Sequence, residues 1–249
     1  MQLQKIAISS NQYIDLTKPI DLSIPLDPNV GPLAFHIPAP RFEPIQVGEF
    51  IGSVSRGGSA NCENLFINAH GNGTHTECLG HISKERVTIN QCLKQFHFFA
   101  ELKSVNPHQM GNGDYIIRSE ELDLSSIPTE CEALIIRTLP NNTSKLITNY
   151  SGKNPCYFDP KLTAQIRLHG IKHLIIDLPS VDREEDEGAL AAHHAFWDYP
   201  SAPKYDCTIT EMVFVNDEIQ DGTYFLNIQI ASFESDASPS KIIIYTIQK

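Results

Sequence analysis

Two short apolar runs with a well-marked helix between them constrain this fold more than any other feature of the sequence. Residues 133–137 (ALIIR) and 173–177 (HLIID) are typical of buried strands. Between them, Asp159 suits a helix N-cap, Pro160 suits the first helical position and Gly170 suits the end of the helix. A strand, a helix and a second strand in this order predict a mixed α/β fold.

The rest of the chain adds mainly strands to this unit. Strands are predicted at residues 13–16, within 53–69, and at 212–215, 224–230 and 242–247, with a second helix at 188–196. The segment 19–44 carries seven prolines, so it is expected to form an irregular loop across the surface or the mouth of a site. Strands with a few covering helices predict one α/β domain over residues 1–249, built as a layer or a closed barrel.

The amino-acid composition excludes several classes of function. The chain has 249 residues, 41% of them apolar and 20% charged, which fits a globular protein with a real core. A net charge of −11 argues against nucleic-acid binding and against a polybasic membrane-surface role, but it identifies no substrate. Residues 1–17 lack the apolar stretch of a signal peptide, and six widely spaced cysteines indicate reduced thiols, so a cytoplasmic location is predicted.

The candidate chemistry concentrates in residues 70–81 (HGNGTHTECLGH). Its potential ligands are His70, His75, Glu77 and His81. Imidazole and carboxylate together suit zinc, manganese or iron(II). In a strand, His75 and Glu77 would point to the same face, while Gly71 and Gly73 permit a turn that brings His70 back toward them. The spacing therefore predicts a metal site, and the alternative is a polar turn with solvated histidines.

Two later segments offer further ligands. His193 and His194 are adjacent in the sequence, so only one of them is expected to face a given site. Glu211, next to a predicted strand, becomes a ligand candidate only in combination with the other two segments. His173, which opens an apolar strand, is interpreted as a structural residue.

These motifs resemble the metal-dependent cyclase family of hydrolases, which includes bacterial kynurenine formamidase and isatin hydrolase. Residues 73–77 (GTHTE) followed by His81 match the centre of the family motif HxGTHxDxPxH. Resemblance extends over residues 14–20, 178–182, 192–194, 210–212 and 236–239. The chain departs from the motif because His70 stands five residues before His75 rather than four, and because Glu77 replaces an aspartate.

The resemblance implies a swivelling β/β/α fold in a homodimer or homotetramer, with one or two divalent ions per chain, zinc or alternatively manganese. The implied metal ligands are His70, His75, Glu77, His193 and Glu211. His81 is implied as the proton donor and acceptor. Phe35 in the proline-rich segment is predicted to stack on the substrate, with core packing as the alternative.

A site of this kind predicts hydrolysis, because a divalent ion lowers the pKa of the water it binds from 15.7 to about 7. The predicted substrate is a small amide, formamide, lactam or lactone, and the activity is arylformamidase-like. Two alternatives stay open. The same residues could abstract a carbon-bound proton in a dehydratase or isomerase, or the metal could only hold the loop of a non-catalytic binding protein.

Overall fold

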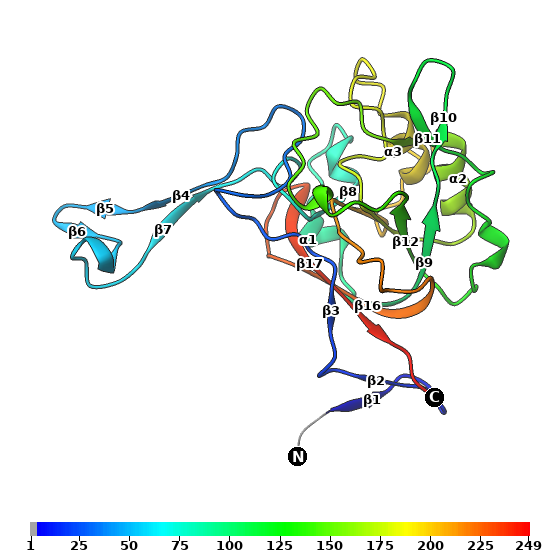
Figure 1. Ribbon diagram of the computed structural model, residues 1–249, viewed down its shortest axis with the longest axis horizontal. Helices are drawn as coiled ribbons and strands as arrows, with labels where there is room; N and C mark the ends of the chain where they lie inside the picture. Colours follow the sequence, from blue (N-terminus) through cyan, green and yellow to red (C-terminus); the bar gives the residue numbers. More distant parts are fainter. Residues whose placement is uncertain (1–3) are drawn as a thin grey trace.

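Seven strands close into a ring at the centre of the molecule (Figure 1). The computed structural model describes residues 4–249. Around the ring the order is β16 (Gly222–Ile230), β9 (His97–Val105), β12 (Ala133–Thr138), β14 (His173–Ile176), β15 (Thr208–Glu211), β8 (His75–Cys78) and β17 (Ala237–Thr246). Pairing of β17 with β16 closes the ring, and the short β3 (Ile20–Asp21) pairs with the outer side of β17.

Smaller elements surround this ring. The α-helices are α1 (Ile89–Cys92), α2 (Pro160–Leu168) and α3 (Ala191–Trp197). Single turns of 3₁₀ helix are η1 (Val54–Arg56), η2 (Leu79–His81), η3 (Leu124–Ser126) and η4 (Thr143–Leu146). The remaining strands are β1 (Lys5–Ala7), β2 (Tyr13–Asp15), β4 (Arg41–Pro44), β5 (Gln46–Val47), β6 (Phe50–Ile51), β7 (Glu63–Phe66), β10 (His108–Gln109), β11 (Tyr115–Ile117) and β13 (Tyr157–Phe158).

The core has two parts, separated by the wall of the ring. Along β12, Ala133 and Ile135 join a cluster formed by side chains from strands around the ring. Leu134 and Ile136 point the other way, into a cluster that includes α2 and α3. Successive side chains of a strand face opposite sides, so one apolar run supplies both clusters. The predicted α/β class, with a barrel-like layer and flanking helices, is confirmed.

Helix α2 begins and ends as its sequence predicts. The Asp159 carboxylate accepts a hydrogen bond from the Lys161 amide at 2.8 Å, which satisfies one of the unpaired donors of the first turn. Leu162 and Ile166 are buried against the sheet. Gly170 follows in the left-handed region at φ +101°, a conformation that ends helices and that glycine adopts without strain.

The predicted strand at 212–215 is wrong, because the strand lies just before it as β15. Met212 has φ +53°, which breaks the extended chain immediately after Glu211. The threonines of β15 are fully buried because their hydroxyls find partners: Thr208 hydrogen-bonds His173 and Thr210 hydrogen-bonds Thr76, each at 2.8 Å. Predictions for the other late strands are confirmed by β16 and β17, and α3 begins three residues after the predicted start.

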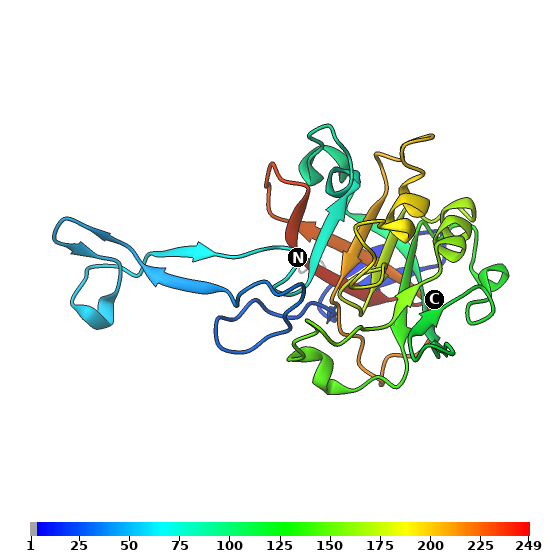
Figure 2. The same cartoon turned by 90° about the horizontal axis from the view of Figure 1, so that it is seen from above.

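A two-stranded arm, residues 41–66, projects from the body (Figures 1 and 2). Strand β4 pairs with β7 along its shaft, and β5 pairs with β6 near its tip. Of the region 53–69, which was predicted to be strand-rich, only β7 is a strand and residues 54–56 form a 3₁₀ turn. The proline-rich segment is largely irregular between β3 and β4, as predicted.

Two further observations concern the whole described chain. No helix within residues 4–249 has the length and apolar character needed to cross a bilayer. All six cysteines have free thiols. The predicted domain spans residues 1–249, and its first three residues lie outside the described part of the chain.

Candidate metal centre

Strand β8 places His75 and Glu77 on one face, where both are fully buried. Its neighbours are β15 and β17, and the register sets His75 directly opposite Glu211. The His75 Nε2 atom lies 3.3 Å from the Glu211 Oε2 atom. His75 donates from Nδ1 to the Gly73 carbonyl oxygen at 3.0 Å, which holds the ring with Nε2 toward the carboxylates.

His70 reaches the same cluster despite the extra residue before His75. Gly71 fits only because it lacks a side chain, since a Cβ there would stand 2.6 Å from the Ile37 side chain. Gly73 adopts φ +145°, in the region that favours glycine. The resulting turn sets His70 Nδ1 3.2 Å from Glu77 Oε2 and leaves the His70 and His75 ring centroids 5.2 Å apart.

Helix α3 contributes His193, which lies on the far side of Glu77. Its Nε2 atom is 3.0 Å from Glu77 Oε1 and 3.8 Å from Glu211 Oε1. The Asp182 carboxylate accepts from His193 Nδ1 at 2.6 Å and also from the backbone amides of Ala192 and His193. Asp182 therefore fixes both the start of the helix and the orientation of the ring. His194 faces away and hydrogen-bonds the Tyr199 carbonyl oxygen.

His81 lies on the open side of the cluster, with 27% of its side chain exposed. Its Nδ1 atom is 3.4 Å from Asp236 Oδ2 and 3.7 Å from Glu77 Oε2. The same Asp236 oxygen accepts from His70 Nε2 at 2.8 Å. Asp236 thus links the two half-exposed histidines.

Sequence reasoning assigned no role to Asp182 or Asp236, although both belong to segments that resemble family segments. Both act at a distance along the chain: Asp182 is 11 residues from His193, and Asp236 is 166 residues from His70. The resemblance of residues 178–182 (LPSVD) and 236–239 (DASP) to family segments could have indicated these two aspartates. The spacing of the ligand candidates could not.

The residues fit a divalent cation. They form two groups of potential ligands, His70–Glu77–His81 and His75–Glu77–Glu211, and the two groups share Glu77. Two atoms at their junction, His75 Nε2 and Glu77 Oε2, are buried without a hydrogen-bond partner among residues 4–249. Their contacts with Glu211 Oε2 and His70 Nδ1, at 3.3 and 3.2 Å, are ion-pair contacts without hydrogen-bond geometry. A cation would satisfy both buried atoms.

The electrostatics of the cluster lead to the same conclusion. Burial lowers the pKa of His70 and His193, but the carboxylates around each ring outweigh burial and raise both to about 10. Burial alone would raise the pKa of Glu77, but the charges of His81 and His193 hold it well below its usual value. The cluster therefore carries more negative charge than its side chains neutralise, and protons on the rings take the place that a cation would fill.

Phe35 follows the residue whose backbone is bonded to the turn at Gly71. The amide of the preceding residue, Ala34, donates to the Gly71 carbonyl oxygen at 3.1 Å, and Phe35 itself has φ +56° and a half-buried side chain. Within residues 4–249 its ring makes no aromatic contact with His70, His75 or His81. Its stacking role stays a prediction.

Comparison with known proteins identifies the family of this chain. A family model described as "Putative cyclase" matches residues 20–183, which is more than half of the chain. The chain belongs to this cyclase family. The matched range includes the cluster around His75 and ends one residue after Asp182, so His193 and Glu211 lie beyond it.

Relatives match nearly the whole length of this cyclase-family chain. Kynurenine formamidase of Bacillus cereus (strain ATCC 14579) is 24% identical over 246 residues, covering 96% of this chain and all of the relative. An isatin hydrolase bound to the product analogue thioisatinate superposes with a TM-score of 0.66 at 13% identity, over 93% of each chain. A structure titled as a potential metal-dependent hydrolase with cyclase activity gives the same TM-score at 14% identity, over 92% of this chain and 97% of that one. These structural likenesses show the shared fold.

Proposed function

We propose that this cyclase-family protein is a metal-dependent hydrolase that cleaves a small amide, formamide, lactam or lactone. The observation that carries the proposal is the junction of the two ligand groups, where His75 Nε2 and Glu77 Oε2 are buried without a hydrogen-bond partner among residues 4–249. The names of the relatives, kynurenine formamidase and isatin hydrolase, favour a C–N bond in an amide or cyclic amide as the target.

The residues of the cluster divide into holding, orienting and proton-handling groups. A divalent ion, zinc or manganese, would supply Lewis acidity and make water a nucleophile near neutral pH. The residues that would hold one or two such ions are His70, His75, Glu77, His193 and Glu211. Asp182 orients the His193 ring from behind.

His81 is the residue proposed to move the proton. It is the most exposed histidine of the cluster, so it can reach both the buried carboxylates and a substrate arriving from solvent. Its Nδ1 atom faces Asp236, a carboxylate that can stabilise the protonated ring. The other ring nitrogen would then exchange a proton with the leaving nitrogen or oxygen of the substrate.

The proposal includes a small-molecule partner and a cytoplasmic location. The net charge of −11 supports a partner other than nucleic acid or an anionic membrane. The free thiols of all six cysteines fit a reducing compartment.

Metal content by elemental mass spectrometry, on protein purified without a metal-binding tag, tests the proposal directly. We expect about one or two zinc or manganese ions per chain. The variants His75→Ala and Glu77→Ala should lose them. The matched control is His36→Ala, which removes an exposed histidine of the neighbouring loop and should leave metal content unchanged.

Hydrolysis is then measured with a panel of formamides, lactams and lactones. The wild type should turn over at least one class, and His81→Ala should retain metal but lose most of the rate. A metal-free wild type that takes up neither zinc nor manganese would sink the proposal. Deuterium incorporation into the substrate without net hydrolysis would instead show that the protein is a dehydratase or isomerase that abstracts a carbon-bound proton.

A further inference from the structure

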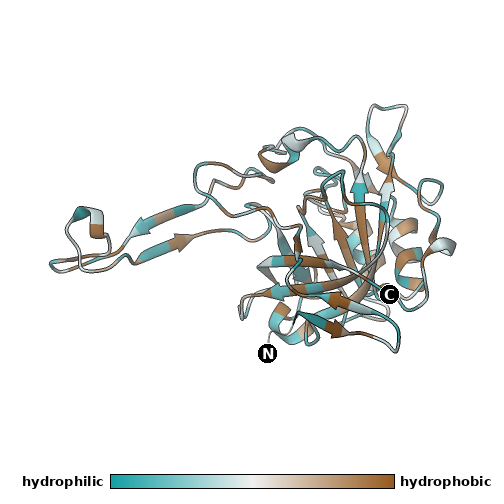
Figure 3. Ribbon diagram, turned by 60° about the horizontal axis from the view of Figure 1, so that its bottom comes forward, coloured by the Kyte–Doolittle hydropathy of each residue, from teal (hydrophilic) through white to brown (hydrophobic). Residues whose placement is uncertain are grey.

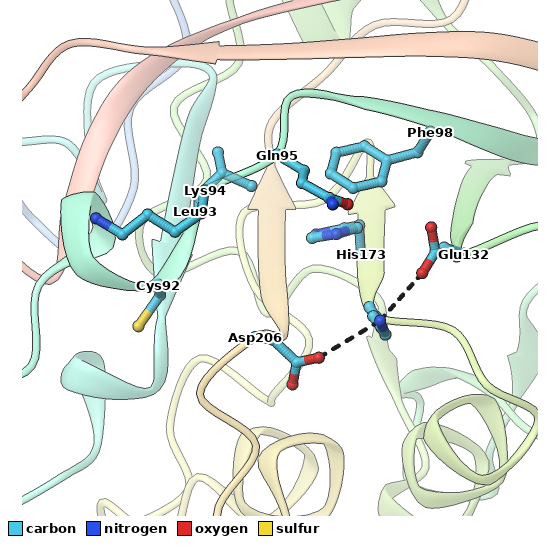
Figure 4. Close-up of a pocket in the computed structure, with 9 residues that line it drawn as sticks. Cys92, Leu93, Lys94, Gln95, Phe98, Glu132, His173 and Asp206 are labelled. Atoms are coloured by element: carbon cyan, nitrogen blue, oxygen red, sulfur yellow. Dashed lines mark ion pairs between the residues drawn. The ribbon is translucent and has the colours of Figure 1, made fainter.

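A cavity of about 300 Å³ opens at the amino end of β15, whereas Glu211 stands at the carboxyl end of that strand (Figure 4). We call it the barrel-mouth pocket. Its lining comes from the segment 92–95 at the end of α1 and from the amino ends of four parallel strands, β9, β12, β14 and β15. The volume is at the lower end of the range for small-molecule sites.

His173 points from β14 toward the inside of the ring. It lies two residues before Ile175, which belongs to the inner apolar cluster, and alternate residues of a strand share a face. Glu211 points to the outside, since Ile209, two residues before it, packs in the cluster with α2 and α3. The barrel-mouth pocket and the candidate metal centre therefore lie on opposite faces of the same wall.

The His173 imidazole carries a hydrogen-bonding atom that the protein leaves unused. Apolar positions recur along the strands of the ring (Figure 3), and only 3% of His173 is exposed among them. Its Nδ1 atom is bonded to Thr208 Oγ1 at 2.8 Å, whereas Nε2 has no hydrogen-bond partner among residues 4–249. Nε2 is also absent from the unpartnered atoms that the described chain seals from solvent, so it borders the cavity. A buried polar side chain thus aims a free hydrogen-bonding group into the pocket.

Gln95 supplies a second polar group, and the surface around it is apolar. Figure 4 shows its side chain extending toward the Phe98 and His173 rings, whose centroids lie 4.0 Å apart. The Gln95 amide has no hydrogen-bond partner within the described residues 4–249, and it offers a donor and an acceptor side by side. With Leu93 and Phe98 as apolar lining, the pocket suits a flat molecule that has one polar edge.

The charges around the pocket are already compensated. Lys172 Nζ lies 3.0 Å from a Glu132 carboxylate oxygen and 3.5 Å from one of Asp206. Lys94 donates to a backbone carbonyl at 2.7 Å, and Figure 4 shows its ammonium directed away from His173. Burial lowers the pKa of His173 to about 3, so its ring is neutral near pH 7. An ionised ligand would lose its hydration here without gaining a free counter-charge, which favours a neutral one.

We propose that the barrel-mouth pocket is a second small-molecule site, for a neutral planar ligand that presents a hydrogen-bond donor beside an acceptor. A cyclic amide has such an edge, because its N–H and C=O groups match the two groups of the Gln95 amide. The ligand would also take the one hydrogen bond that His173 Nε2 leaves free. No metal is needed at this site, so the proposal goes beyond the hydrolase activity and stands or falls independently of it.

Calorimetric titration of the full chain with oxindole, a neutral bicyclic lactam, tests the proposal. The protein is first stripped of metal with a chelator, so that metal ligation contributes nothing to the heat. We expect saturable binding of oxindole. Gln95→Leu and His173→Phe should each raise its dissociation constant at least about 10-fold, because each removes one hydrogen bond to an enclosed ligand. Gln95 is exposed, so its replacement should leave folding unaffected.

Matched ligands and variants make the result specific. Indole has the same ring shape without the carbonyl group, and benzoate carries a negative charge, so both should bind at least about 10-fold more weakly than oxindole. Gln46→Leu, at an exposed glutamine of the arm, should bind oxindole as the wild type does, and so should Glu77→Gln.

Four outcomes would overturn the proposal. They are the absence of saturable oxindole binding, an affinity that both Gln95→Leu and His173→Phe leave intact, tighter binding of benzoate than of oxindole, and loss of binding in Glu77→Gln. The last result would assign oxindole to the candidate metal centre instead. Failure of the hydrolase proposal would appear separately, in the metal content and turnover of the wild type.

Discussion

Two buried histidines, His193 of α3 and His173 of β14, lie near opposite ends of β15. The pKa of His193 is raised and that of His173 is lowered. His193 meets Glu211 at the end of the strand, and the surrounding carboxylates raise its pKa to about 10. His173 meets Thr208 at the beginning of the strand, and burial together with the Lys172 charge lowers its pKa to about 3. Burial is almost complete at both, with 2% and 3% of each residue exposed, so burial alone does not decide the outcome.

The groups in contact with each imidazole decide whether its pKa is raised or lowered. His173 packs against the Phe98 ring at 4.0 Å between centroids and lines a cavity of about 300 Å³ (Figure 4). The nearby acids, Glu132 and Asp206, pair with Lys172 rather than with the imidazole. His193 instead touches Asp182 and Glu77 directly. Carboxylates in direct contact with the imidazole, rather than burial of the histidine, therefore mark the candidate cation-binding end of this molecule.

Removing the shared carboxylate should have the largest effect. Glu77→Gln keeps the shape of the side chain but removes a charge from both ligand groups, so we expect metal affinity to fall more than about 100-fold and activity with it. In the metal-free protein the pKa of His193 should fall below about 10, because the charge of Glu77 is the largest cause that raises it. NMR titration of the imidazole protons measures this. A His193 pKa unchanged at about 10 would show that Glu77 is not the decisive partner.

Removing the charge of Asp182, which orients the His193 ring, should lower metal affinity by less than the change at Glu77. Asp182→Asn keeps a hydrogen-bond acceptor for His193 Nδ1 but loses the charge, and such second-layer changes cost about 10- to 100-fold in metal affinity. Competition with a chelator of known affinity measures the loss. Asp206→Asn, at the other end of the strand, is the matched control and should bind metal as the wild type does. Equal affinities for Asp182→Asn and the wild type would remove Asp182 from the site.

Metal uptake should release protons. With the pKa of His70 and His193 at about 10, both rings are charged at pH 8 in the metal-free protein, and ligation requires their neutral form. We expect about two protons released per chain at pH 8 and progressively fewer as the pH rises through 10. Isothermal titration in two buffers of different ionisation enthalpy counts them. Heats that do not depend on the buffer would contradict the raised pKa values.

At neutral pH no effect is expected from His173, whose pKa is lowered rather than raised, and its effect on stability appears only in acid. Its folded pKa of about 3 lies below its unfolded value of about 6.5, so the unfolded state binds the proton first. Stability contributed by this residue is therefore complete above pH 6.5 and lost between pH 6.5 and 3, at about 1.4 kcal/mol per pH unit. His173→Asn should lose this part of the acid sensitivity, as measured by urea unfolding of metal-free protein. Parallel stability curves for the variant and the wild type would show that His173 does not titrate as described.

Sequence predicts this fold best where local signals suffice. The apolar runs of β12 and β14 and the caps of α2 are properties of neighbouring residues, and all three elements are where the sequence predicts them. Strand β15 escaped prediction because TITE is polar. Its threonines become suitable for the interior only through hydroxyl partners on other strands, such as Thr76 and His173.

The candidate site, too, could be predicted only in part from the sequence. The residues of 70–81 that the sequence groups by spacing do converge, and the β8 register and the position of α3 bring Glu211 and His193 to them from separate segments. Asp182 and Asp236 were not assigned because their importance comes from which ring nitrogen each one meets. That choice depends on tertiary geometry and leaves no periodic trace in the chain.

The closed ring also sets an order for events during synthesis. Strand β8 carries His75 and Glu77, yet both of its partners, β15 and β17, come from the last 42 residues of the chain. A nascent chain emerging from the ribosome therefore exposes these two candidate ligands long before the strands that pair with β8 exist. The complete candidate cation site can form only once the polypeptide is almost finished, so we expect a cation to bind the released protein rather than the growing one.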